Sequence, residues 1–336
     1  MTSVTREASV GERSESAADN GLLKVFIAVQ KYMLVVLIVL ELVVFGIMSP
    51  TFFTGSNWIN IIVNSADLGL ISAGLTLIIL MAGIDVSTGF AVGLISWVIA
   101  TAMGKGLPSF LVLAIAILLG MVLSIFNGLL TIQLSIPSIV ATLGTSALFQ
   151  TILYYLWDSR DVMAQPVYAW LSGIAMIGPI PAIAIIVLMI YILLHLILTK
   201  TVFGRNIFAI GSNPEAARLA GINIKCVRFA AYAILGVLLG LAACVYSARL
   251  GVVQATSGNE LTMLAIASVV VGGTSILGGE GSMLRTLGGL IFISVLRNGV
   301  VLIGVPSLWT GVLVGLAILL AITINGLVNH YMHKQR

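Results

Sequence analysis

Long apolar runs separated by short polar segments are the feature of this sequence that most restricts its fold. Most of the runs approach the roughly 20 residues that a helix needs to cross a hydrocarbon layer about 30 Å thick. In lipid every backbone polar group must be hydrogen-bonded within the protein, so such runs are expected to be helices. Hydrophobic residues make up 60% of the chain and charged residues only 8%. The sequence therefore predicts an all-α, polytopic integral membrane helical bundle.

About ten spans can be distinguished by run length and by interruptions. They cover residues 32–48, 60–80, 85–103, 109–132, 138–157, 175–199, 227–248, 262–277, 286–303 and 308–326. The third and eighth spans are interrupted by glycine and are short enough to be partly re-entrant. Spans two to five and seven to ten each begin with an apolar helix followed by a Gly-interrupted one, which suggests an inverted repeat.

The two ends of the chain are polar. Residues 1–20 mix charged residues with Ser and Ala and contain no apolar stretch, so they predict a disordered tail rather than a signal peptide. We expect a disordered N-terminal tail at 1–23, a transmembrane domain at 24–326 that contains a polar loop at 200–225, and a C-terminal tail at 327–336.

Lys and Arg are distributed unequally between the two sides of this bundle. An even number of spans places both termini and the loop 200–225 on one side, which carries 12 of the 16 Lys and Arg residues. The other four are Lys105, Arg160, Arg249 and Arg297. The positive-inside rule makes the first side cytoplasmic. This asymmetry accounts for the net charge of +4, so no nucleic-acid partner is expected.

The loop 200–225 contains a complete signal for one short helix. Residues suited to the N-cap, the first turn and the left-handed stop follow one another in order: Asn213, Pro214, Glu215, Ala216, Ala217 and Gly221. At about 1.5 Å per residue the helix is roughly 10 Å long, too short to persist alone in water, so it must pack on something. We expect the bundle to present it to a soluble partner.

No enzymatic or metal-binding motif is present in the sequence. It has no H-E-x-x-H, C-x-x-C, G-x-S-x-G or Gly-rich phosphate loop, and Cys226 and Cys244 do not have the spacing of metal ligands. We expect no catalytic residue, no metal and no cofactor bound by this chain. If the bundle moves a solute, the energy must come from an ion gradient or from a nucleotide that another subunit hydrolyses.

Three carboxylates bear on the ion-gradient alternative, because charges inside a membrane are costly and usually functional. Glu41 lies near the middle of the first span, where it is either part of a proton relay or a bundle-facing side chain hydrogen-bonded to a neighbouring helix. Asp67 and Asp85 lie near the ends of spans, where hydration or helix capping is sufficient to explain them.

Two Gly-rich interruptions, at residues 81–89 and 271–282, are candidates for a solute pathway. Non-helical backbone at membrane depth is tolerated only where it is buried in protein or lines a water-filled path. The alternative is close helix packing through small residues.

The loop 200–225 resembles the cytoplasmic "EAA-type" loop of permease subunits of bacterial ATP-binding cassette importers. The matching residues are Gly204, Arg205, Ala209, Gly211, Asn213, Ala216, Ala217, Gly221 and Ile222. Four further segments are similar to the monosaccharide branch of that family: 83–87; 127–130 with 136–145; 272–275 with 278–279; and 297–299. The similarity covers residues 30 to 325. Departures at Ala82, Thr88, Phe90 and Thr262 weaken any inference about which sugar is carried.

The resemblance implies a multi-pass protein of the bacterial inner membrane with both termini in the cytoplasm. Two permease subunits, identical or paralogous, would form the pore within the membrane lipid. A cytoplasmic ATP-binding subunit, which uses the ATP, would dock on residues 213–221, and an extracytoplasmic sugar-binding protein would deliver the solute. The expected coupling residues are Gly204, Arg205, Gly211, Asn213, Glu215, Ala216, Ala217, Arg218 and Gly221. In this scheme Ala216 and Ala217 would offer a flat face to the ATPase, and the arginines would contact the ATPase or anionic lipid, or only set the topology.

The pathway candidates are polar residues of the matching segments: Asp85, Ser87, Asn127, Thr142, Thr145, Thr274 and Ser275. Few aromatic residues accompany them, which indicates a permissive channel whose selectivity resides in the binding protein. The main interpretation is an importer permease for a monosaccharide or related small polyol. A branched-chain amino acid permease of the same architecture and an autonomous proton-coupled carrier are the alternatives.

Overall fold

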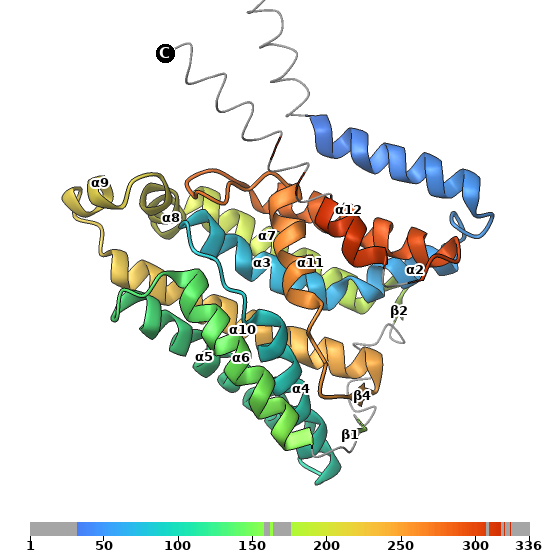
Figure 1. Ribbon diagram of the computed structural model, residues 1–336, viewed down its shortest axis with the longest axis horizontal. Coiled ribbons are helices and arrows are strands. Elements are labelled where there is room, and N and C mark those ends of the chain that lie inside the picture. Colours follow the sequence, from blue (N-terminus) through green and yellow to red (C-terminus); the bar gives the residue numbers. More distant parts are fainter. Residues whose placement is uncertain are drawn as a thin grey trace, which may run out of the picture.

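The computed structural model describes residues 32–157, 162–163, 176–306, 309–316, 319 and 323. The predicted tails at 1–23 and 327–336 lie outside these residues. The described chain is almost entirely helical (Figure 1), which confirms the all-α prediction.

The helices follow one another with few strands between them. They are Tyr32–Met48, α2 (Gly55–Asn64), α3 (Ala66–Leu80), α4 (Thr88–Gly104), α5 (Ser109–Ile132), α6 (Ser138–Trp157), α7 (Ala182–Lys200), α8 (Val202–Ser212), α9 (Pro214–Leu219), α10 (Ile224–Leu250), α11 (Leu261–Val271), α12 (Met283–Leu302) and residues 309–316. Two antiparallel pairs of two-residue strands complete the fold, β1 (Val162–Met163) with β4 (Val252–Val253) and β2 (Met176–Ile177) with β3 (Ile180–Pro181).

The predicted spans 32–48, 109–132 and 138–157 coincide with helices, and three other spans differ from the prediction. The second is divided at Ser65 into α2 and α3, which meet at an angle of 44°. The sixth begins at Ala182 rather than 175, because the β2–β3 hairpin turns at Gly178 with φ of 63°. The eighth ends at Val271, so α11 is about 16 Å long and cannot cross a membrane by itself. Among the described residues, five helices are long and apolar enough to span, or six if α2 and α3 count as one.

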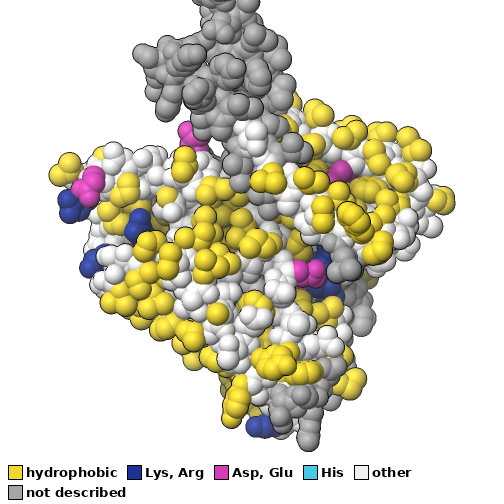
Figure 2. Space-filling model, viewed as in Figure 1, with side chains coloured by type: hydrophobic (Ala, Val, Ile, Leu, Met, Phe, Trp, Pro, Cys, Tyr) yellow, Lys and Arg dark blue, Asp and Glu magenta, His cyan; other side chains and the backbone are white. Residues whose placement is uncertain are grey.

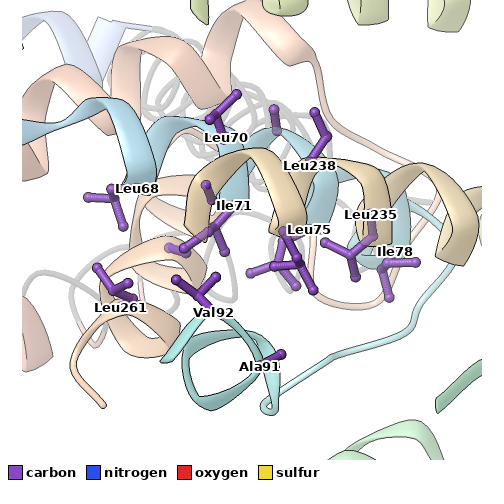
Figure 3. Packing of buried hydrophobic residues seen from close by; sticks show 14 of the residues in the cluster. Leu68, Leu70, Ile71, Leu75, Ile78, Ala91, Val92, Leu235, Leu238 and Leu261 are labelled. Atoms are coloured by element: carbon purple, nitrogen blue, oxygen red, sulfur yellow. The ribbon is translucent and has the colours of Figure 1, made fainter. Parts of the chain in front are cut away.

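Helix α3 forms the centre of the bundle, and all 15 of its residues are buried. Figure 3 shows Ile71 and Leu75 of α3 close to Val92 of α4 and to Leu235 of α10. A helix that is enclosed by protein on every side needs no polar face, which explains why α3 is apolar all round. Helices α2, α7, α8, α10, α11 and α12 pack against α3, whereas α5 packs against α10 and α4, and α6 packs against α4 and α5.

Helices α5 and α10 cross with their backbones in contact. Small residues recur at every fourth position of α5, at Ala116, Gly120, Ser124 and Gly128, and face α10 at a G-x-x-x-G pair, Gly236 and Gly240. A Cβ atom on Gly236 would lie 2.5 Å from the Cα of Met121, and one on Gly240 would lie 2.7 Å from the Cα of Ile117. Such spacing is typical of close helix packing in membranes.

The two ends of the bundle are held together separately. At the end where α9 lies, the Lys225 side chain donates to Gln133 at 3.1 Å, and α8 packs against the segments that follow α3 and α11. At the opposite end, Asn57 and Asn298 exchange hydrogen bonds of 3.1 and 3.0 Å. Figure 2 shows hydrophobic side chains over much of the face between the ends, and charged side chains in small groups, one of them over α9.

Candidate coupling loop and broken segments

Helix α9 forms where its capping residues predict it. The Asn213 side chain accepts a hydrogen bond from the Ala216 amide at 3.0 Å, and Pro214 occupies the first helical turn. Gly221 follows with φ of 82°, the left-handed conformation that ends a helix. Figure 1 shows α9 at the left extremity of the molecule, away from the central helices.

The exposed surface of α9 differs from the predicted one at Ala217. This side chain is only 4% exposed and belongs to the hydrophobic core of its own chain, so the expectation that it offers a flat face to a partner is wrong. The helix has to anchor one side in the bundle, and Ala217 supplies that anchor. Leu219 is 86% exposed instead, next to the exposed Arg218–Glu215 ion pair of 2.7 Å. A large apolar residue in a polar loop was the sequence signal for this surface.

Helix α8 was not predicted from the sequence, which indicated only one short helix in the loop. Its N-cap is Thr201, whose hydroxyl accepts a hydrogen bond from the Gly204 amide at 3.2 Å. At its other end, Gly211 touches the carbonyl oxygen of Leu80 and the amide of Gly279 so closely that a Cβ atom would clash with both. The Gly279 amide also donates to the Leu80 carbonyl at 2.9 Å.

Both Gly-rich interruptions therefore meet at the end of α8. We call residues 81–87, between α3 and α4, the first broken segment, and residues 272–282, between α11 and α12, the second. A Cβ atom on Gly278 would lie 2.7 Å from the Ala82 amide, and Ala82 itself has φ of 60°. This junction brings the loop and the two segments into backbone contact.

A buried network of polar side chains connects the first broken segment to α5. Asp85 is fully buried, and its Oδ1 accepts hydrogen bonds from the Ser87 amide at 2.9 Å and from the Ser87 hydroxyl at 2.7 Å. The Asn127 side chain of α5 donates to Asp85 Oδ2 at 3.1 Å and to the Ser87 hydroxyl at 2.7 Å. Asp85 has no access to solvent, so of its two predicted explanations hydration is excluded, and Ser87, the residue before α4, satisfies one carboxyl oxygen.

The same segment is also connected to the start of α6. The Thr142 hydroxyl donates to the Ile84 carbonyl at 3.1 Å and accepts from the Val86 amide at 3.1 Å. The Ser138 hydroxyl accepts from the Ile84 amide at 3.0 Å. Thr145, one turn further along α6, donates to the Thr142 carbonyl at 3.3 Å.

Thr274 and Ser275 belong to the second broken segment and lie apart from this network. Thr274 is fully buried and its hydroxyl has no hydrogen-bond partner among the described residues, while the Ser275 amide donates to the Glu280 carbonyl at 2.9 Å. Of the seven pathway candidates, only Ser275 is partly exposed. Their contact with a solute therefore stays a prediction.

Comparison with known proteins identifies the family. The family model described as "Branched-chain amino acid transport system / permease component" matches residues 57–322. The chain belongs to this permease family. The match confirms the resemblance to transport permeases that the loop and the broken segments indicated.

Curated relatives are similar over most of their length. The ribose import permease protein of Bacillus subtilis is 34% identical over 84% of this chain and 88% of its own. A probable ABC transporter permease protein of Escherichia coli is 33% identical over 90% of this chain and 91% of its own. The autoinducer 2 import system permease protein of Yersinia enterocolitica is 31% identical over 84% of this chain and 78% of its own. No solved structure matches the chain.

Two further carboxylates lie in buried environments. Asp67 pairs with Arg249 at 2.7 Å and accepts a hydrogen bond from the Leu68 amide in the first turn of α3, so of its two predicted explanations hydration is excluded. Glu41 is 7% exposed, and neither of its carboxyl oxygens has a hydrogen-bond partner in the described structure. The hydrogen-bonded interpretation of Glu41 therefore has no support among the described residues and stays a prediction. No group of three potential metal ligands occurs among the described residues.

Proposed function

We propose that this permease is the membrane-spanning subunit of an ATP-binding cassette importer that carries a monosaccharide or related small polyol across the bacterial inner membrane. A separate subunit binds and hydrolyses the ATP, and an extracytoplasmic binding protein delivers the solute. The observation that carries the proposal is α9, a capped helix that projects from the bundle with Leu219 exposed and Ala217 anchored. The names of the ribose and autoinducer 2 relatives support a polyhydroxylated solute.

The orientation follows from charge. The loop 200–225 with α8 and α9, and the start of α10, carry Lys200, Arg205, Arg218, Lys225 and Arg228, which supports a cytoplasmic location of this end by the positive-inside rule. We propose that both termini are cytoplasmic as well. The opposite end, where β1 pairs with β4, then faces the binding protein. A second copy or a paralogue of this permease completes the pore.

Coupling proceeds from α9 through α8 to the broken segments. When the ATPase subunits close, α9 moves as a rigid body with the subunit on which it docks. Helix α8 carries this displacement to Gly211, which contacts Leu80, the last residue of α3, and Gly279 of the second broken segment. Gly278 of the second segment in turn contacts Ala82 of the first. The Asp85 network and Thr142 then transmit it to α5 and α6. Access to the solute path changes from the outside to the inside.

The choice of solute has one alternative, because the family description names branched-chain amino acids. A free amino acid carries two opposite charges that a pore has to accommodate. The pathway candidates are hydroxyl and amide side chains apart from Asp85, whose carboxyl group is occupied by Ser87 and Asn127. Uncharged hydrogen-bonding groups suit a neutral polyol better.

Co-purification followed by ATP hydrolysis tests the proposal. The tagged permease, isolated from membranes of its own host, should bring an ATP-binding subunit with it. In proteoliposomes the complex should hydrolyse ATP faster when a loaded sugar-binding protein is added, and leucine with its binding protein should have no effect. Accumulation of solute by the permease alone would refute the proposal, and stimulation by leucine would assign it to amino acids.

A matched pair of variants tests the role of α9. Leu219→Glu places a charge on the exposed docking surface and should abolish both ATPase retention and uptake. Leu134→Glu makes the same change at another exposed leucine, 64% accessible, outside α9, and should retain the ATPase. Equal loss in both variants would contradict the assignment of α9.

A further inference from the structure

A cavity of about 310 Å³ opens at the α9 end of the bundle, between the first broken segment, the α5–α6 turn and α10. Five of its lining residues are polar: Thr131, Ser135, Ser138 and Tyr232, which carry hydroxyl groups, and Arg228, which carries a guanidinium. The volume lies at the lower limit of small-molecule sites. Several hydroxyl groups and one cation in such a space suit a small polyol that carries a negative charge.

A second cavity of about 380 Å³ adjoins the first one. The two share Ile132 and Arg228, and the second is also lined by Lys225, Arg218 and the apolar side chains of Ile222 and Ile224. Three cationic side chains thus surround a space whose remaining walls are largely apolar. This combination is typical of sites that hold the headgroup of an anionic lipid at the cytoplasmic side of a membrane.

Among the described residues, no carboxylate forms an ion pair with Arg228 or Lys225. Arg228 is half-buried and makes no hydrogen bond or ion pair with another described residue. Lys225 donates to Gln133, which is uncharged. Only Arg218 has an acidic partner, Glu215, in an exposed pair that contributes little. A half-buried guanidinium without a partner is suited to bidentate binding of a phosphate group.

We propose that the two joined cavities bind a phosphate ester of a small polyol. Arg228 and Lys225 hold the phosphate, and the hydroxyl-lined cavity holds the polyol. The start of α10 at Ile224 adds the positive end of a helix dipole to the same site. Two sources share this chemistry: phosphatidylglycerol, whose acyl chains would follow Ile222, and a soluble polyol phosphate of the cytoplasm. The proposal does not depend on the identity of the transported solute.

Titration calorimetry on the full-length permease in phosphatidylcholine nanodiscs tests the site. The probes are dihexanoyl phosphatidylglycerol, glycerol 3-phosphate and inorganic phosphate. We expect Arg228→Gln and Lys225→Gln each to weaken binding of the ester by about tenfold or more, as for loss of a charge-assisted hydrogen bond. Lys200→Gln removes the same charge from an exposed residue at the same end, outside both cavities, and should leave binding unchanged.

The outcomes separate the two sources and can overturn the proposal. Tighter binding of the phosphatidylglycerol than of glycerol 3-phosphate would identify the membrane as the source, and equal binding would identify a soluble ester. The proposal fails if neither ester binds, if inorganic phosphate binds as tightly as glycerol 3-phosphate, or if Lys200→Gln weakens binding as much as Arg228→Gln does. Lys225 is exposed, so its variant remains informative even if Arg228→Gln impairs folding.

Discussion

Replacement of Asn127 by leucine tests whether the buried network stabilises the first broken segment. The change keeps a similar volume and removes the donor to Asp85 at 3.1 Å and to the Ser87 hydroxyl at 2.7 Å. Water cannot replace this donor, because Asp85 is fully buried. A lost hydrogen bond to a charged group costs about 1.5–3 kcal/mol, so the unfolding temperature should fall by about 2–4 °C.

A double-mutant cycle isolates the contribution of the carboxylate. In the Asp85→Asn background the same leucine removes a bond between neutral groups and should cost about 1 kcal/mol, which leaves a coupling energy of about 1–2 kcal/mol. Scanning fluorimetry of the four proteins in nanodiscs provides the measurement, and Asn60→Leu, at an exposed asparagine of α2, is the control. An equal effect of Asn127→Leu in both backgrounds would refute the reasoning.

Three further substitutions have defined outcomes. Glu41→Leu removes a buried carboxyl group without a described partner and should raise the unfolding temperature by a few degrees, with uptake unchanged; loss of uptake would favour a proton-coupled carrier. Arg249→Met leaves Asp67 buried and unpaired at a cost of about 3–5 kcal/mol, and adding Asp67→Asn should restore most of the lost thermal stability. Gly236→Leu should separate α5 from α10 and abolish folded protein in size-exclusion chromatography, whereas Gly144→Leu, at an exposed glycine with open space around it, should be tolerated.

The sequence predicts α9 correctly because every signal for it is local. Asn213, Pro214 and Gly221 act through the backbone of their own turn, so neighbouring residues are sufficient to specify the helix. The orientation of α9 depends on contacts with the rest of the chain instead. Leu219 stands out in the sequence as a large apolar residue in a polar loop, but only the packing of the bundle determines that Ala217 is buried and Leu219 exposed.

The same distinction explains the candidate site. The glycines at 83, 211 and 279 indicate that another part of the chain can approach the backbone closely at these positions. The sequence does not show which part of the chain approaches each glycine. Gly211 and Gly279 are 68 positions apart in the sequence. They are neighbours in the fold because both contact the carbonyl oxygen of Leu80, the last residue of α3. Asp85 and Asn127 are likewise joined across 42 positions by the packing of α4 on α5. Tertiary packing, and not the local sequence, therefore determines which of these polar residues pair.

The contact at Gly211 is well suited to transmit motion because no flexible side chain intervenes. Side chains can change rotamer and absorb a displacement, whereas packed backbone atoms resist compression. Gly211 contacts the Leu80 carbonyl and the Gly279 amide directly, and those two groups are hydrogen-bonded to each other at 2.9 Å. A displacement of α8 must therefore move the end of α3, from which the first broken segment starts, together with the second broken segment, or break that bond. Since neither segment is helical, each can change its backbone angles without unwinding a helix, and this makes them the elements of the permease most able to switch between two arrangements.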